Sequence, residues 1–97
     1  MAQERGRYGI CNRSRLRDLL ATVVDEETKQ EIIDAVERLR SDPFAVEVRS
    51  LPAQRRNRPN QYNAEVARDW WLSFEIVPDQ PPLARCLRVL ALVHMVL

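Results

Sequence analysis

The side chains in this sequence that could cleave a phosphodiester without a metal are one histidine, His94, and a set of arginines. Such cleavage of RNA needs a base for the 2′-hydroxyl, cations that hold the phosphate, and an acid for the leaving 5′-oxygen. Histidine exchanges protons near neutral pH, and the guanidinium fork binds phosphate through two hydrogen bonds. His94 and Arg88 are separated by an even number of positions, so an extended strand would place them on the same face. Together with Arg68 they form the candidate catalytic group; the alternative for His94 is a packed side chain in an apolar strand.

A second group of side chains could hold an RNA chain. Arg55, Arg56 and Arg58 lie close together in a segment bracketed by prolines, and such charges bind backbone phosphates. Tyr62 and Trp71 could stack on unpaired bases, as aromatic side chains do in proteins that bind single strands. The alternatives are a solvated loop for the arginines and core packing for the aromatic rings.

Metal and redox chemistry are not indicated by the sequence. The two cysteines, Cys11 and Cys86, lie far apart with no CxxC pair, so no zinc site of usual spacing can be assembled. The first residues are charged and lack the apolar core of a secretory signal. The apolar run at residues 83–97 contains two arginines and is shorter than the roughly 20 residues of a membrane span. We therefore expect no metal, no cofactor and no membrane insertion, and a cytoplasmic protein with reduced thiols.

Length and charge indicate one small globular domain over residues 1–97. The chain has 97 residues, 45% of them hydrophobic, and a net charge of +1. This net charge excludes binding to nucleic acid through bulk charge alone, although a local basic patch remains compatible with it. Residues 25–43 carry seven acidic and three basic side chains, whereas the segments on either side are net basic. We expect an acidic helix between basic flanks.

The first half of the chain has helical periodicity. Leucines and a valine recur at i, i+3, i+4 and i+7 from Leu16, which predicts a helix over 15–24 that Asn12 or Ser14 could cap. Asp25 is then a fresh N-cap for a second helix over 26–40, which Asp42-Pro43 ends. With almost no spacer between them, the two helices are expected to form a hairpin.

The second half changes to a period of two, which predicts strands. Alternating segments begin at Phe44, Tyr62 and Trp70, and the third places Trp70 with the core residues and Trp71 on the polar face. The last apolar run fits a central strand or a buried helix by periodicity alone; our topology assigns residues 89–95 to a strand. Tyr8 and Ile10 could add a short leading strand. The expected fold is α+β, with an N-terminal helical hairpin packed on a small antiparallel sheet.

Three motifs occur along the chain in a fixed order. They are LRSDP at residues 39–43, RDWW with FEI at 68–71 and 74–76, and VLALVHM at 89–95. With these motifs, residues 15–96 resemble the RelE/ParE superfamily of bacterial toxins from type II toxin–antitoxin systems. The corresponding family elements are Leu-x-x-Asp-Pro after a helical hairpin, a Gly-Asp-x-Arg-like turn with a Tyr-Glu-Ile-like strand end, and a final strand similar to Val-Leu-x-Val-x-His-Arg.

This resemblance implies a cytoplasmic bacterial toxin that acts on mRNA as a metal-free endoribonuclease and is neutralised by an antitoxin protein. Its implied partners are the antitoxin and either mRNA or the ribosome. The chain departs from the family where a strand arginine is replaced by Trp71 and where Met95 follows the histidine instead of arginine. The C-terminal tyrosine of active relatives also has no counterpart. Two alternatives therefore stay open: a catalytically silent RelE-fold module that binds protein or RNA, and a gyrase-directed toxin of the ParE branch.

Overall fold

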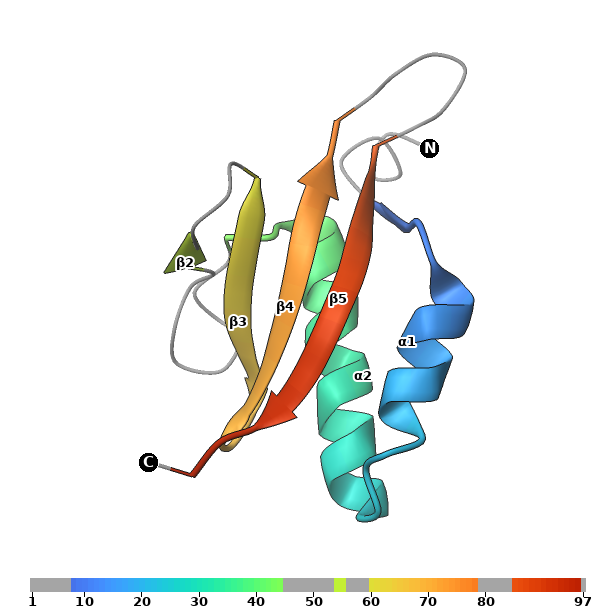
Figure 1. Ribbon diagram of the computed structural model, residues 1–97, viewed down its shortest axis with the longest axis vertical. Helices are drawn as coiled ribbons and strands as arrows, with labels where there is room; N and C mark the ends of the chain where they lie inside the picture. The colour runs from blue at the N-terminus through green and yellow to red at the C-terminus, as the bar shows by residue number, and fades with distance from the viewer. Residues whose placement is uncertain (1–7, 45–53, 56–59, 79–84, 97) are drawn as a thin grey trace.

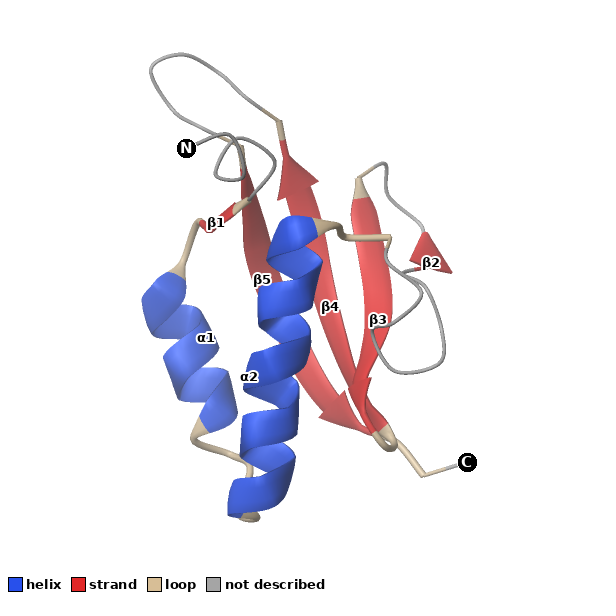
Figure 2. Ribbon diagram, turned by 180° about the vertical axis from the view of Figure 1, so that it is seen from behind, coloured by secondary structure: helices blue, strands red, loops and turns tan. Residues whose placement is uncertain are grey.

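In the part of the chain that the structure describes, two helices cover one face of a five-stranded sheet and leave the other face open (Figures 1 and 2). The computed structural model describes residues 8–44, 54–55, 60–78 and 85–96. Within these ranges the α+β class expected from the sequence is confirmed, with the helical hairpin ahead of the main strands.

The hairpin consists of α1 (Arg13–Leu20) and α2 (Glu26–Ser41), which run antiparallel on the same side of the sheet (Figure 2). Helix α2 ends directly before Asp42-Pro43, as predicted, because a proline has no amide hydrogen to continue the helical hydrogen bonds. Helix α1 is shorter than predicted. The Thr22 hydroxyl donates to the Leu19 carbonyl at 2.7 Å, and the branched residues that follow favour extended backbone over another helical turn.

Asp25 is the N-cap of α2, as predicted. Its carboxylate accepts hydrogen bonds from the Thr28 hydroxyl at 2.6 Å and from the Thr28 amide at 3.0 Å. These bonds, the side-chain bond first, stabilise the ionised carboxylate and lower the pKa of Asp25 below 3.8.

The Asp25 cap predicts a specific dependence of stability on acid. Because the folded-state pKa is lowered, the contribution of Asp25 is fully present above pH 3.8 and is lost as the pH falls through the folded-state pKa. We expect Asp25→Asn to keep a cap, since asparagine also accepts these bonds, but to flatten this part of the acid profile. The free energy of unfolding in urea, measured for both proteins across the acid range, tests this. If the free energies of unfolding of the wild type and Asp25→Asn fall in parallel as the pH is lowered, the proposed contribution of Asp25 is contradicted.

The sheet has the order β1-β5-β4-β3-β2. The strands are β1 (Gly9–Ile10), β2 (Gln54–Arg55), β3 (Gln61–Ala67), β4 (Trp70–Val77) and β5 (Cys86–His94). Strands β2 to β5 pair antiparallel, but β1 pairs parallel with β5. The prediction of an antiparallel sheet is therefore wrong at this edge. A two-residue strand has no periodicity of its own, so its partner is decided by the path of the chain through the hairpin.

The remaining strand predictions have different outcomes. The strands expected around Tyr62 and from Trp70 are present as β3 and β4, and the last apolar run is the strand β5. Phe44 lies in a turn, where its amide donates to the Asp42 side chain at 3.0 Å; the rest of the strand predicted from Phe44 lies outside the described residues. No described helix is long and apolar enough to cross a bilayer.

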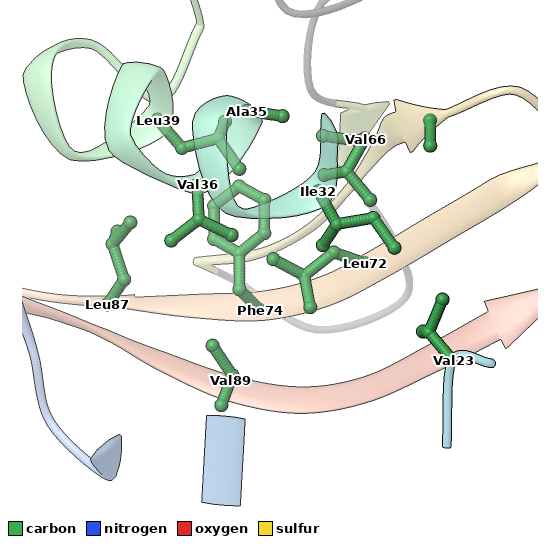
Figure 3. Close-up of a cluster of buried hydrophobic side chains, with 12 residues drawn as sticks. Val23, Ile32, Ala35, Val36, Leu39, Val66, Leu72, Phe74, Leu87 and Val89 are labelled. Atoms are coloured by element: carbon green, nitrogen blue, oxygen red, sulfur yellow. The ribbon is translucent and has the colours of Figure 1, made fainter. Parts of the chain in front are cut away.

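The core lies between α2 and the inner face of β3, β4 and β5 (Figure 3). Its largest fully buried side chain is Phe74, which lies under α2 and stacks on Tyr62 with ring centroids 6.1 Å apart. The other central members come from the helix and from alternate strand positions: Ile32, Ala35, Val36, Leu39, Ala64, Val66, Leu72, Leu87 and Val89. The apolar residues that recur with helical spacing in α2 thus pack against those that alternate along the strands.

Cys11 and Cys86 form a disulfide, so the expectation of reduced thiols is wrong for this structure. Gly9 pairs with Cys86 in the parallel register, which places Cys11, just beyond β1, with its Cα 5.4 Å from that of Cys86. A sequence separation of 75 gives no sign of this contact. It is produced by the parallel pairing of β1 with β5.

Asn12 extends the edge of the sheet beyond β1 instead of capping α1 with its side chain. Its Nδ2 donates to the Val89 carbonyl at 2.9 Å, and the Val89 amide donates to its Oδ1 at 3.0 Å. The side-chain amide thereby replaces the backbone of a strand residue and satisfies both polar groups of Val89.

Candidate functional site

The face of the sheet opposite the helices carries most of the polar strand residues. We call it the open face; Figure 1 views the sheet with the helices behind it. Its described members alternate with core residues along β3, β4 and β5, except where the register shifts once in β3 and once in β5. By strand register they are Gln61, Asn63, Glu65, Trp71, Ser73, Glu75, Val77, Cys86, Arg88, Ala91 and Val93.

Trp71 is the aromatic residue of the open face. It pairs with Glu65 on β3 and with Val93 on β5, and Val93 is 43% exposed. The sequence-based prediction that Trp71 lies opposite the core face is therefore confirmed. A half-buried indole on a sheet face that the described helices leave uncovered has a flat surface on which a base or an apolar side chain can stack.

Arg88 lies on the open face and forms an ion pair with Glu75. Its Nη1 donates to Glu75 Oε1 at 3.0 Å between directly opposite residues of β5 and β4. The side chains are 50% and 36% exposed, so water weakens their attraction and leaves the guanidinium accessible to another anion. A phosphate could bind Arg88, and the adjacent carboxylate is a candidate base for a hydroxyl proton.

A small polar contact lies between Trp71 and this ion pair. Ser73 is only 4% exposed, and its hydroxyl donates to Asn63 Oδ1 at 3.0 Å across β3 and β4. Because neighbouring strand residues are about 3.3 Å apart along the chain, Trp71 and Glu75 are separated by about 13 Å. The open face thus places an aromatic ring and a guanidinium at two ends of a polar strip.

His94 does not share a face with Arg88, so the same-face expectation is wrong. Ser73 pairs with Ala91 while the adjacent Phe74 pairs with Val89, so β5 contains one extra residue at this point. This bulge reverses the alternation of β5 between Arg88 and His94. His94 instead lies opposite Trp70 on the helix side, and the two rings stack with centroids 4.6 Å apart.

Arg68 lies at the same end of the sheet as His94, in the exposed turn between β3 and β4. The next residue, Asp69, has a φ of 65°, a left-handed conformation that aspartate tolerates, and its amide donates to Glu65 at 3.1 Å. The amide of Met95 donates to the Asp69 carbonyl, which fixes the end of β5 beside this turn. The predicted catalytic group is therefore divided: Arg68 and His94 lie at one end, and Arg88 lies further along the sheet on the other face from His94.

The predicted RNA-binding loop is only partly described. The backbone of Arg55 belongs to β2 and pairs with Tyr62, whereas Arg56 and Arg58 lie outside the described residues. Tyr62 is half-buried between Phe44 and Phe74, with ring centroids 5.1 Å and 6.1 Å away. The core-packing alternative for Tyr62 is thus the one its contacts favour.

The carboxylates of the sheet do not form a pair for acid–base chemistry. Glu65 and Glu75 both lie on the open face but near opposite ends of β4, since Glu65 pairs with Trp71. Glu65 accepts the Asp69 amide, and Glu75 binds Arg88. Within the described residues, no three histidine, cysteine, aspartate or glutamate side chains are grouped to hold a metal ion.

A groove on the helix side of the molecule was not predicted from the sequence. It has a volume of about 420 Å³ and lies between α1 and α2. Apolar side chains from α1 and its C-cap line it with basic residues of both helices: Arg13, Leu16, Arg17, Leu20, Ala21 and Lys29. The sequence signal for this groove was the set of arginines in the first helix, whose charge by itself does not indicate a groove.

Comparison of the chain with models of known protein families, with curated proteins and with solved structures found no match.

Proposed function

We propose that this chain is a RelE/ParE-like toxin of a type II toxin–antitoxin system that acts on mRNA and is neutralised by an antitoxin. The observation that carries the proposal is the open face, where Trp71 and the Glu75–Arg88 pair lie on a sheet that the helices leave uncovered. The order of a helical hairpin, a strand hairpin and a final strand also supports it, because the resemblance implies the same order.

On this proposal the open face binds single-stranded RNA. Trp71 stacks on a base, and Arg88 holds a phosphate with its guanidinium fork. For cleavage, Glu75 takes the proton of the 2′-hydroxyl beside the phosphate that Arg88 stabilises. His94 lies on the other face of the sheet from this pair and is not assigned the acid role, so the leaving 5′-oxygen takes its proton from water.

A second candidate is a catalytically silent RelE-fold module that binds RNA or protein without cutting. The observation that favours it is the separation of His94 from Arg88, which leaves the expected acid away from the expected phosphate site. Both candidates use the same binding face and differ in whether the bound RNA is broken.

Induced expression separates the toxin class from an unrelated binding module. We expect growth to stop on induction and to resume when the adjacent reading frame is expressed with it. The purified protein, incubated with RNA in the presence of a chelator, then distinguishes metal-free cleavage from binding alone. Inhibition of gyrase supercoiling without RNA cleavage would replace the proposal by the ParE-branch alternative, and unimpaired growth would contradict the toxin function.

Trp71→Ala is expected to weaken binding of a single-stranded RNA oligonucleotide by about 1–3 kcal/mol, because one base loses its stacking partner. Trp71→Phe keeps a flat ring and should retain most of the affinity. Fluorescence anisotropy with a labelled oligonucleotide measures the dissociation constants. Equal affinities for the wild type and the alanine variant would remove Trp71 from the RNA site.

The antitoxin is expected to carry an acidic segment that contacts the basic residues Arg55, Arg56 and Arg58. Exposed charge pairs are screened by salt, so the three-fold serine variant should lose most affinity at low ionic strength. Titration of the adjacent frame's product into both proteins at low and high salt measures this. An unchanged affinity at low salt would exclude these arginines from the interface.

A further inference from the structure

The disulfide between Cys11 and Cys86 lies where α1 is attached to the sheet. Cys11 stands between β1 and α1, and Cys86 is the first residue of β5. The bond therefore ties one end of α1 to the strand that α1 packs against. The C-terminal end of α1 leads through a short connection into α2 (Figure 1). Helix α1 is therefore held by the disulfide before its first residue and by the second helix after its last.

Helix α1 is the less firmly packed of the two helices. None of its residues is fully buried, whereas α2 buries four. Its polar attachments to β5 include the Asn12–Val89 pair and a 3.1 Å bond from exposed Arg15 to the Leu90 carbonyl. Directly before it, the Cys11 amide donates to the Leu87 carbonyl at 2.9 Å. Leu16, Leu19 and Leu20 pack against the core but are only partly buried. An element that lacks fully buried residues has a lower free energy of local opening than one, such as α2, that has several.

The segment before α1 has its own anchors. The amide of Tyr8 donates to the Arg40 carbonyl at 2.7 Å, and Arg40 Nε donates to the Tyr8 carbonyl at 2.8 Å. The guanidinium of Arg85 also lies 4.5 Å from the centre of the Tyr8 ring. When the disulfide is broken, β1 stays attached through these contacts, and α1 is the element that gains freedom.

We propose that the Cys11–Cys86 disulfide is a reversible redox latch that holds α1 against β5, and that a dithiol reductant opens it while the rest of the domain stays folded. Opening also changes the α1–α2 groove, because Arg13, Leu16 and Arg17 of α1 form one of its walls. Cys86 lies two positions before Arg88 on β5 and takes the same side of that strand, the open-face side. The latch does not rest on the proposed action on RNA, because its test follows the exchange of α1 and uses no RNA.

The exchange proceeds through Cys11, the more exposed residue of the pair. Cys11 is exposed and Cys86 is half-buried, so a thiolate of the dithiol attacks Cys11 Sγ and Cys86 leaves as a thiolate. The second thiol then attacks the sulfur of the reductant in the mixed disulfide and releases Cys11. The protein disulfide gains two electrons and two protons, the dithiol becomes a cyclic disulfide, and a disulfide oxidant reverses the reaction.

Hydrogen exchange of the oxidised and dithiothreitol-treated protein tests the latch. With short labelling times, we expect amides of residues 16–20 in α1 to exchange at least about tenfold faster after reduction, while amides of residues 32–39 in α2 stay protected. Mass spectrometry after alkylation should count two new thiols, and far-ultraviolet circular dichroism should retain the signal of the sheet and α2. Reoxidation should restore the slow exchange of α1.

The variant Cys11→Ser/Cys86→Ser provides the control. It should show the fast exchange of the reduced wild type with and without dithiothreitol, so any change on adding reductant must come from the disulfide. Equal acceleration in α1 and α2, or loss of the folded signal on reduction, would show a global staple and overturn the latch. Unchanged exchange in α1 after complete reduction, or thiols that react only in denaturant, would also overturn it.

Discussion

Phe74→Ala is expected to lower the free energy of unfolding by about 3–5 kcal/mol, the usual loss when a buried phenylalanine is truncated. Phe74 is fully buried at the centre of β4 (Figure 3), under α2 and against Tyr62. Removal of the phenyl ring leaves a cavity between α2 and the sheet, and these two elements cannot move together enough to fill it. Since the free energy of unfolding of a small domain is only about 5–15 kcal/mol, this single change should remove much of it.

Urea denaturation followed by circular dichroism measures this loss. Val93→Ala is the matched control, because it also shortens an apolar strand residue but at a position 43% exposed on the open face. We expect the control to stay within about 0.5 kcal/mol of the wild type. Equal losses for the two variants would show that the core does not lie between α2 and the sheet.

Arg88→Ala is expected to lower the rate of RNA cleavage by about 10²–10³-fold, the effect of removing one donor that stabilises the transition-state charge. Arg88 is the described guanidinium on the open face and lies 3.0 Å from the Glu75 carboxylate. Arg88→Lys keeps the charge but cannot bind phosphate with a planar fork, so it should recover only part of the rate.

His94→Gln is the comparison that separates the two possible sites. If His94 were the general acid or base, the rate would fall by about 10²–10⁴-fold. Because His94 stacks on Trp70 on the other face from Arg88, we expect the cleavage rate to stay near that of the wild type and the melting temperature to fall. A large loss of rate with unchanged melting would return His94 to the active site. A wild-type protein that binds but never cuts RNA would favour the silent module.

The sequence by itself determined the local structure of this protein. Asp25 caps the second helix and Asp42-Pro43 ends it, because capping and the missing proline amide depend on neighbouring residues only. The alternation around Phe74 likewise assigned Trp71 to the open face, because side chains of a regular strand must alternate. The α+β class followed from the change of period between the two halves.

Only the tertiary structure decided how distant residues meet. One extra residue in β5 moved His94 away from Arg88, and a bulge is set by strand pairing that no single strand reveals. The parallel pairing of β1 with β5 likewise brought Cys11 to Cys86, although 75 positions separate them. Periodicity shows which face a residue takes within a regular element. Register and strand order depend on contacts between elements, and these contacts decided which of the predicted site residues could act together.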